Sequence, residues 1–302
     1  MARKKVVMAK IGLGYLLLDD DETLGKSVMK TIGKEIELAC KSLGLDDILT
    51  VSISAEVKRD LESATRFVTS ADSLPDWVFV DQRLDRENGR LLVESLSAMG
   101  YPADVLFYTA ATEVPRLNRD IALRYGKVRS ASSQTLSPLV NQMAKEFLIK
   151  WGDPEYVRGL VLSRAVDVDI AMDECIVKYF KIADGNKGHF AHYILGANGV
   201  RLGVKLDLLD KAKKSLEDKK KFQAYHQIER GKVQALFEKT RNVFAHKTLQ
   251  RDPMNPFKIK LESKTGEIET MEKRQLDIYF LQCSRMISDL RRLENDLAET
   301  YA

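Results

Sequence analysis

The first half of the chain alternates short apolar runs with stretches of helical periodicity. Apolar or alternating segments predict strands at residues 15–18, 48–53, 77–80, 105–108 and 127–129. Between them, apolar residues at three- and four-residue spacing predict helices at residues 27–43, 56–68, 90–99, 116–125 and 136–148. A regular β-α alternation of this kind is typical of an α/β doubly wound parallel sheet, whose strands are buried on both faces.

The second half loses the strand rhythm. Helical patterns cover residues 158–180, 204–216, 228–246 and 276–297. Residues 257–271 predict two short strands around a turn that contains Gly266. We therefore expect an all-α helical bundle with a small β-hairpin. The sequence WGDP at residues 151–154 interrupts the helical patterns, which predicts two domains, residues 1–150 and 151–302.

The composition is that of an ordinary globular chain, with 44% hydrophobic and 30% charged residues. No apolar run approaches the roughly 18 residues of a membrane span, so we expect no membrane association. The first apolar run ends at three aspartates without a small-residue cleavage site, which argues against a signal peptide. Three widely spaced cysteines, Cys40, Cys175 and Cys283, favour a reducing cytoplasm over a disulfide framework or a cysteine-rich zinc site.

The positive charge lies in the second half. Residues 1–150 contain 21 Lys and Arg against 21 Asp and Glu, whereas residues 151–302 contain 27 against 23. The excess is concentrated in the run KAKKSLEDKKK at residues 211–221. Such a run permits an RNA partner, but it is more often a solvated helix face.

Acidic and hydroxyl side chains follow three of the predicted strands. Asp19, Asp20 and Asp21 follow the first strand, Asp81 the third and Thr109 the fourth. Parallel strands place their carboxyl ends at one edge of the sheet, so these groups are expected to meet there. Clustered carboxylates repel one another unless a cation lies between them, and Mg²⁺ fits oxygen ligands of this type. The alternative is that these are loop residues that cap helices.

The segments YLLLDDDE, DWVFVDQRLDRENGRLLVESL and ADVLFYTA resemble the receiver domain of two-component response regulators over about residues 15–148. The resemblance implies that Asp81 is the phosphoacceptor and that Thr109 senses the phosphoryl group. It also implies that Asp19, Asp20 and Asp81 hold Mg²⁺, that Gly89 is the glycine after the phosphorylation loop, and that the partner is a histidine kinase.

Two departures from that family leave an alternative open. The family has a lysine at the end of the fifth strand, whereas this chain has Ser132 and Ser133 near that position, and Lys127 lies too early. Asp20 and Asp81 are also further apart in sequence than is usual in the family. The alternative is a pseudo-receiver that only mediates contacts.

A second motif, KTRNVFAHK, occupies residues 239–247. Asn242 and His246 are four residues apart and share a helix face, and Arg241 is long enough to reach the imidazole. An imidazole can exchange a proton with a ribose hydroxyl near neutral pH, and a guanidinium can neutralise charge on phosphate oxygens. The pair therefore suits RNA cleavage without a metal. The alternative is that His246 only complements the dipole at a helix C-terminus.

The surrounding segments RGLVLSRAVDVDIAMDECIVKYF, LGVKLDLLD and TRNVFAHKTL resemble the HEPN superfamily over about residues 156–297, in the RNxxAH form of its Arg-x4–6-His motif. The resemblance implies a helical bundle and a homodimer. It also implies a composite cleft where Arg241 and His246 of both chains meet, with Asn242 beside the arginine. Similar domains include proteins resembling the mannitol operon repressor, which we do not group with nucleases.

Together the two halves predict a signal-controlled, metal-independent endoribonuclease. A receiver-like input domain would regulate a HEPN output domain that acts on RNA as a cytoplasmic homodimer, in a toxin, stress or antiviral (phage) defence role. The alternative is a non-enzymatic regulator, in which the helical domain binds nucleic acid or a protein partner and the first domain is a pseudo-receiver.

Overall fold

The computed structural model describes residues 9–46, 49–70, 75–81, 91–94, 104–110, 128–181, 195, 201–216, 225–252 and 255–301. The chain forms two compact units. The first unit consists of Met1–Val157 and Thr248–Ile278, and the second of Arg158–Lys247 and Tyr279–Ala302. The chain therefore passes between the units three times, and a segment from the second half belongs to the first unit.

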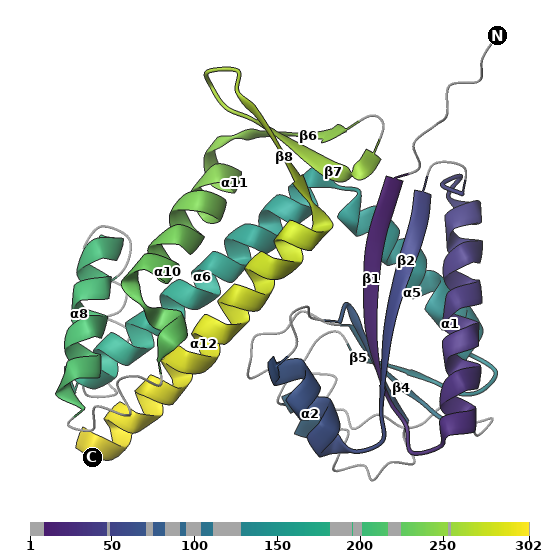
Figure 1. Ribbon diagram of the computed structural model, residues 1–302, viewed down its shortest axis with the longest axis horizontal. Helices are drawn as coiled ribbons and strands as arrows, with labels where there is room; N and C mark the ends of the chain where they lie inside the picture. The colour runs from purple at the N-terminus through teal and green to yellow at the C-terminus, as the bar shows by residue number, and fades with distance from the viewer. Residues whose placement is uncertain are drawn as a thin grey trace. The chain divides into compact units, whose positions relative to one another are not determined.

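The first unit contains a sheet of five parallel strands. They are β1 (Ala9–Leu18), β2 (Leu49–Lys58), β3 (Trp77–Asp81), β4 (Asp104–Tyr108) and β5 (Val128–Ala131). Their order is β2-β1-β3-β4-β5, and Figure 1 shows β1 beside β2. The predicted α/β class is confirmed. This doubly wound order reverses between β1 and β3, and functional groups gather at such a switch point.

Helices cover both faces of this sheet. Helices α1 (Glu22–Ser42) and α5 (Leu136–Trp151) contribute to one core, and α2 (Leu61–Ser70) contributes to the other. On β1, Leu17 packs in the α1–α5 core, whereas Leu16 and Leu18 pack in the α2 core. Successive strand residues point to opposite faces, so burial on both faces explains why β1 and β3 are continuous apolar runs.

Two local predictions for the first unit differ from the structure. The helix expected from residue 56 begins at Leu61, because β2 remains paired with β1 as far as Lys58, opposite Leu18. The strand expected at residues 15–18 begins at Ala9. The helix expected at residues 90–99 is described at residues 91–94, which are helical, and the helix expected at residues 116–125 lies outside the described residues.

The first unit also contains a small antiparallel sheet of β6 (Thr248–Asp252), β7 (Asn255–Glu262) and β8 (Ile268–Glu272). The predicted hairpin is β7–β8, and its turn contains Gly266 with φ of +83°, a conformation that favours glycine. Strand β6 was not predicted, because TLQRD has a single apolar residue. Phe257 of β7 is buried in the core formed by α1 and α5.

A buried lysine fixes the first turn of α12 (Lys273–Tyr301) within the first unit. The Lys273 ammonium lies 2.9 Å from a carboxylate oxygen of Asp76 and 2.8 Å from one of Asp277. It also lies 4.8 Å from the centre of the Trp151 ring, a cation–π contact. Asp76 accepts a hydrogen bond from the Gly14 N–H, at 2.9 Å. We call these residues the Lys273 cluster; it joins α12 to β1, α5 and the start of β3.

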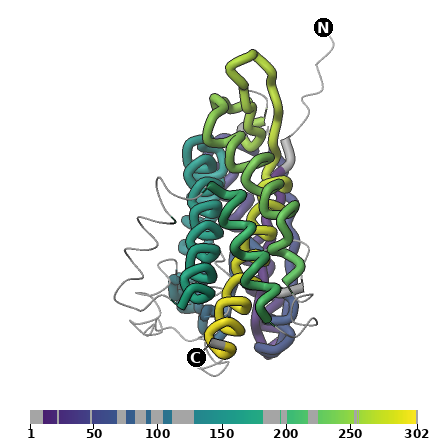
Figure 2. Tube along the Cα trace, turned by 90° about the vertical axis from the view of Figure 1, so that its left-hand side faces the viewer, coloured from purple at the N-terminus to yellow at the C-terminus, as the bar shows by residue number. Residues whose placement is uncertain are grey.

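The second unit is a helical bundle. Its elements are α6 (Pro154–Tyr179), α8 (Leu202–Ser215), η2 (His226–Ile228), α10 (Arg230–Leu236), η3 (Phe237–Arg241), α11 (Asn242–His246) and most of α12. Figures 1 and 2 show α6 and α12 side by side. The Cys175 thiol of α6 donates to the Leu290 carbonyl of α12 at 3.0 Å, which is consistent with that packing. No helix in the described part of the chain is long and apolar enough to cross a membrane.

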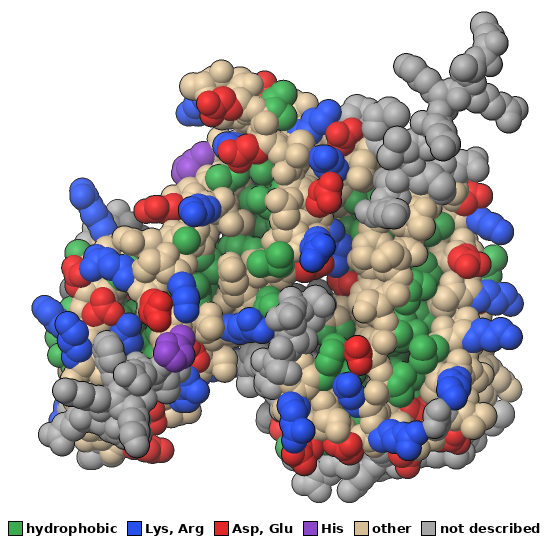
Figure 3. Space-filling model, in the orientation of Figure 1, with side chains coloured by type: hydrophobic (Ala, Val, Ile, Leu, Met, Phe, Trp, Pro, Cys, Tyr) green, Lys and Arg blue, Asp and Glu red, His purple; other side chains and the backbone are tan. Residues whose placement is uncertain are grey.

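The lysines of α8 have two different environments. Lys205 is buried and pairs with Asp169 at 2.9 Å and Asp173 at 2.8 Å, both on α6. Lys213 is also buried, and its ammonium donates to the Ile228 carbonyl at 3.3 Å. Lys211 and Lys214 are exposed, and Figure 3 shows Lys and Arg mixed with acidic side chains over α8 and α10. The predicted basic run is therefore partly structural.

Candidate functional site

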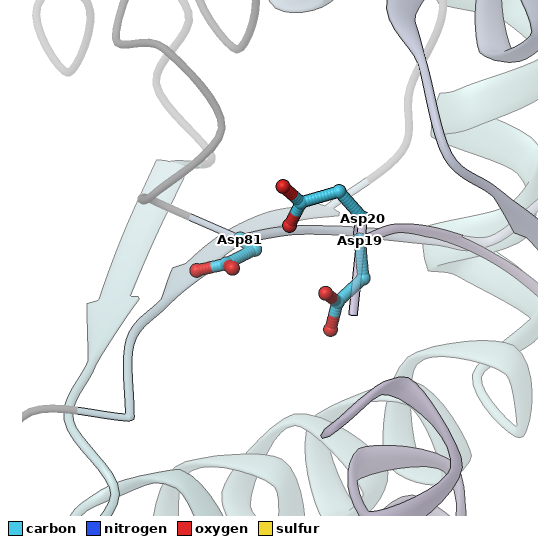
Figure 4. Close-up of side chains that lie close together, drawn as sticks. All are labelled: Asp19, Asp20 and Asp81. Atoms are coloured by element: carbon cyan, nitrogen blue, oxygen red, sulfur yellow. The ribbon is translucent and has the colours of Figure 1, made fainter. Parts of the chain in front are cut away.

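Three carboxylates meet at the switch point of the parallel sheet. Asp19 and Asp20 directly follow β1, and Asp81 is the last residue of β3. One oxygen from each of the three lies within 4.8 Å of the others. Figure 4 shows that Asp19 and Asp20, although adjacent in sequence, direct their carboxylates to different sides, and that Asp81 approaches from the neighbouring strand. The structure thus brings together the three acids that the sequence predicts at this edge.

Asp19 and Asp81 are buried, whereas Asp20 is exposed, and both oxygens of Asp19 accept hydrogen bonds. One accepts from the Asp21 N–H at 2.8 Å, and the other accepts from the Tyr108 hydroxyl. Burial raises the pKa of Asp19, and the negative charges of Asp20 and Asp21 raise it further, while the two hydrogen bonds lower it. Burial also raises the pKa of Tyr108, so this hydroxyl stays protonated as a donor.

Asp21 has a different role from its two neighbours. Its side chain accepts hydrogen bonds from the backbone N–H groups of Thr23 at 2.8 Å and Leu24 at 3.1 Å. It is therefore the N-cap of α1, where a carboxylate also complements the helix dipole. The capping explanation that the sequence left open applies to this residue.

The ends of β4 and β5 complete the edge. Thr109 follows β4, is buried, and its N–H donates to the Ala131 carbonyl of β5 at 3.1 Å. Ser132 follows β5 and is buried, and its N–H donates to the Thr135 hydroxyl at 2.9 Å. Ser133 is exposed, and none of the described residues 132–135 after β5 is basic. Gly89 and Lys127 lie outside the described residues.

The chemistry of this edge follows from its donor set. Carboxylate oxygens alone fit a hard divalent cation such as Mg²⁺, and a cation would relieve the repulsion among the three acids. Asp20 is exposed, whereas Asp81 is buried at the end of its strand, so an ion held by these two acids would reach solvent on the Asp20 side. Asp19 is held by Tyr108 and the Asp21 backbone, which fixes its orientation.

The basic motif of the second unit lies on a short helical segment. Arg241 ends η3, a single turn of π-helix, and Asn242–His246 forms α11. The Arg241 Nη1 donates to the Asn242 Oδ1 at 2.9 Å, so the amide orients the guanidinium. Arg241 and His246 are exposed, whereas Phe244 between them is completely buried. Isolated π-helical turns inside helices occur frequently at functional sites.

The backbone around His246 is held from α6. Arg158 Nη1 donates to the Phe244 carbonyl at 3.0 Å, and its Nη2 donates to the Lys247 carbonyl at 3.2 Å. These two acceptors lie on either side of His246 in the sequence. A cation at the last carbonyls of a helix satisfies them and complements the helix dipole.

Two of these residues, Tyr108 and Arg158, were not predicted from the sequence. Tyr108 is the last residue of an apolar run and directly precedes Thr109. Its hydroxyl group, at the end of a strand beside other polar residues, was the feature that could have indicated a role in the site. Arg158 has no signal of its own, because its partners are 86 and 89 positions away in the chain.

No model of a known protein family matches the chain, and no curated protein matches it. Among solved structures, the chain is similar to the signal receiver domain of the response regulator NarL from Mycobacterium tuberculosis. That similarity has 18% identity and a TM-score of 0.29, and covers 44% of this chain and 97% of the other. The strand order of the first unit and the helices on both faces of its sheet by themselves establish a doubly wound parallel sheet.

Proposed function

We propose that this protein is an endoribonuclease controlled by a receiver-like input unit. The observation that supports this best is the arrangement of the RNxxAH motif. Arg241 is exposed at the end of η3 and is oriented by Asn242, and His246 is exposed at the end of α11, which follows directly. Side chains that are presented to solvent and held by the scaffold are what acid–base and electrostatic catalysis require.

In the second unit, His246 would exchange the proton and Arg241 would bind the phosphate. Cleavage needs a base to remove the proton of the ribose 2′-hydroxyl and an acid to protonate the leaving 5′-oxygen. A homodimer with a two-fold axis would bring two copies of His246 to one scissile phosphate and so supply both groups. The planar guanidinium of Arg241 would donate hydrogen bonds to two phosphate oxygens and neutralise their developing charge.

In the first unit, Asp81 would be the phosphoacceptor. A carboxylate oxygen of Asp81 would attack the phosphorus of a donor, and the donor would leave with the bonding electron pair. Asp20 and Asp81 would hold Mg²⁺, which when bound neutralises phosphoryl oxygens. Thr109 would then hydrogen-bond the new phosphoryl group through its hydroxyl.

A second candidate for the first unit is a contact module that is not phosphorylated. Ser132 at the end of β5 favours it, because the residue there is neutral and engaged with Thr135. In that case the protein would be a non-enzymatic regulator, or a nuclease under another control.

The test is cleavage of total RNA by the purified full-length protein in EDTA. We expect wild-type protein and the His226→Ala variant to cleave, since His226 is an exposed histidine of the same unit outside the motif. We expect His246→Ala to lose activity by about 100-fold or more, the usual scale for a positioned acid–base group. Absence of cleavage by wild-type protein, with and without Mg²⁺ and acetyl phosphate, would favour the regulator.

A further inference from the structure

Among the described residues, the Arg158 side chain holds the backbone on both sides of His246. Its two hydrogen bonds end on the carbonyl two residues before this histidine and the carbonyl one residue after it. The Phe244 carbonyl belongs to the last turn of α11. In a longer helix it would accept from residue 248, but β6 begins at Thr248, so the helix supplies no donor there.

The position of Arg158 in the chain gives this contact a second consequence. Arg158 is the first residue of the second unit, and Lys247 is the last residue before the chain passes back to the first unit. Tyr279, where the chain enters the second unit again, donates from its hydroxyl to the Val161 carbonyl of α6 at 3.1 Å. Residues at all three crossings are thus tied to one end of α6, within the second unit.

We propose that Arg158 is a positioning residue for His246. By fixing the carbonyls on either side, it fixes the direction in which α11 presents the imidazole. The same guanidinium holds the Lys247 carbonyl, so a displacement of Lys247 would also disturb the contact that holds the backbone at Phe244. The effect of Arg158 on catalysis rests on the proposed ribonuclease function. Its effect on the position of His246 can be measured without RNA.

The experiment uses the His Cε1–Hε1 resonances of the full-length protein in solution NMR. The chain has four histidines, and the His246 signal is the one that disappears in His246→Gln. Arg158→Met keeps most of the side-chain length and removes the donors. The control is Arg230→Met, because Arg230 also donates to a backbone carbonyl of this unit, that of Gly203 at 3.2 Å.

We expect Arg158→Met to shift or broaden the His246 signal and leave the His226 signal unchanged, and Arg230→Met to leave the His246 signal as in the wild type. Arg158→Lys provides a single ammonium that cannot hold both carbonyls, so its effect on His246 should be intermediate. Circular dichroism shows whether Arg158→Met folds. If it does not, the His246 signal of Arg158→Lys tests the proposal instead. A His246 signal identical to the wild type in a folded Arg158 variant would overturn the proposal.

The activity assay separates this proposal from the proposed function. If the wild type cleaves RNA, Arg158→Met should lower kcat by up to about 100-fold, the cost of displacing a catalytic group by about 1 Å, with little change in KM. If the wild type does not cleave RNA, the ribonuclease proposal fails, and the NMR signal still decides whether Arg158 positions His246.

Discussion

Replacement of Lys273 by methionine should destabilise the first unit strongly and in a pH-dependent way. The Lys273 side chain is 6% exposed, and its partners Asp76 and Asp277 are 12% and 24% exposed. Removal of one partner from a buried ion pair typically costs about 3–5 kcal/mol, because the remaining charge is left uncompensated. Asp277 is partly exposed and can take up a proton, so we expect a value at the lower end of this range. The free energy of unfolding should fall by about 3 kcal/mol at pH 8.

The pH dependence follows from Asp277. Burial raises the pKa of Asp277 to about 6 even beside the lysine, and loss of the lysine raises it further. A raised folded-state pKa means that the folded protein gains stability from this group as the pH falls through that value. At pH 5 the protonated Asp277 no longer repels Asp76, so the loss caused by Lys273→Met should be clearly smaller than at pH 8.

Tryptophan fluorescence measures this effect selectively. The chain has two tryptophans, Trp77 and Trp151, and both belong to the first unit. A loss of about 3 kcal/mol corresponds to a fall in Tm of about 6–12 °C for a unit of this size. The control is Lys258→Met, which removes a surface pair with Glu272 and should cost at most about 1 kcal/mol. An equal loss at both pH values, or a loss no greater than that of Lys258→Met, would refute the reasoning.

Three further predictions concern the candidate sites. Acetyl phosphate with Mg²⁺ should add one phosphoryl group to the wild type but none to Asp81→Asn, and an unchanged intact mass of the wild type would favour the contact module. Tyr108→Phe should cost about 1–3 kcal/mol in denaturant unfolding followed by tryptophan fluorescence, because Asp19 loses a buried hydrogen-bond donor; a midpoint equal to the wild type would show that the bond contributes nothing. Light scattering of the full-length protein at micromolar concentration should give the mass of a dimer, and a monomer would contradict the composite cleft.

The sequence predicted the parallel sheet and its acidic edge well, for a physical reason. Strands buried on both faces must be continuous apolar runs, and the carboxyl ends of parallel strands meet at one edge. The chain positions of Asp19 and Asp81 were therefore sufficient to place them together. The sequence could not distinguish Asp21, which caps α1, from its two neighbours, because the three differ only in the backbone conformation around them.

Contacts between distant parts of the chain could not be predicted. Lys273 lies 197 positions from Asp76, and no local pattern separates a buried lysine from a solvated one. The same limit applies to Lys205 and Lys213, which are ordinary members of a helical pattern by sequence but lie inside the bundle. Strand β6 depends on pairing with β7 more than on its own composition, so its polar sequence gave no signal.

The most direct test of the proposed ribonuclease is the chemical identity of the RNA ends it produces. A synthetic single-stranded RNA would be incubated with the wild-type protein and with His246→Ala in EDTA, and the products analysed by mass spectrometry. Attack by the ribose 2′-hydroxyl predicts 5′-products that end in a 2′,3′-cyclic phosphate or its hydrolysis product, formed by the wild type and lost in the variant. A DNA of the same sequence should remain intact. 5′-Products that end in a free 3′-hydroxyl, or equal cleavage by His246→Ala, would contradict the proposed chemistry.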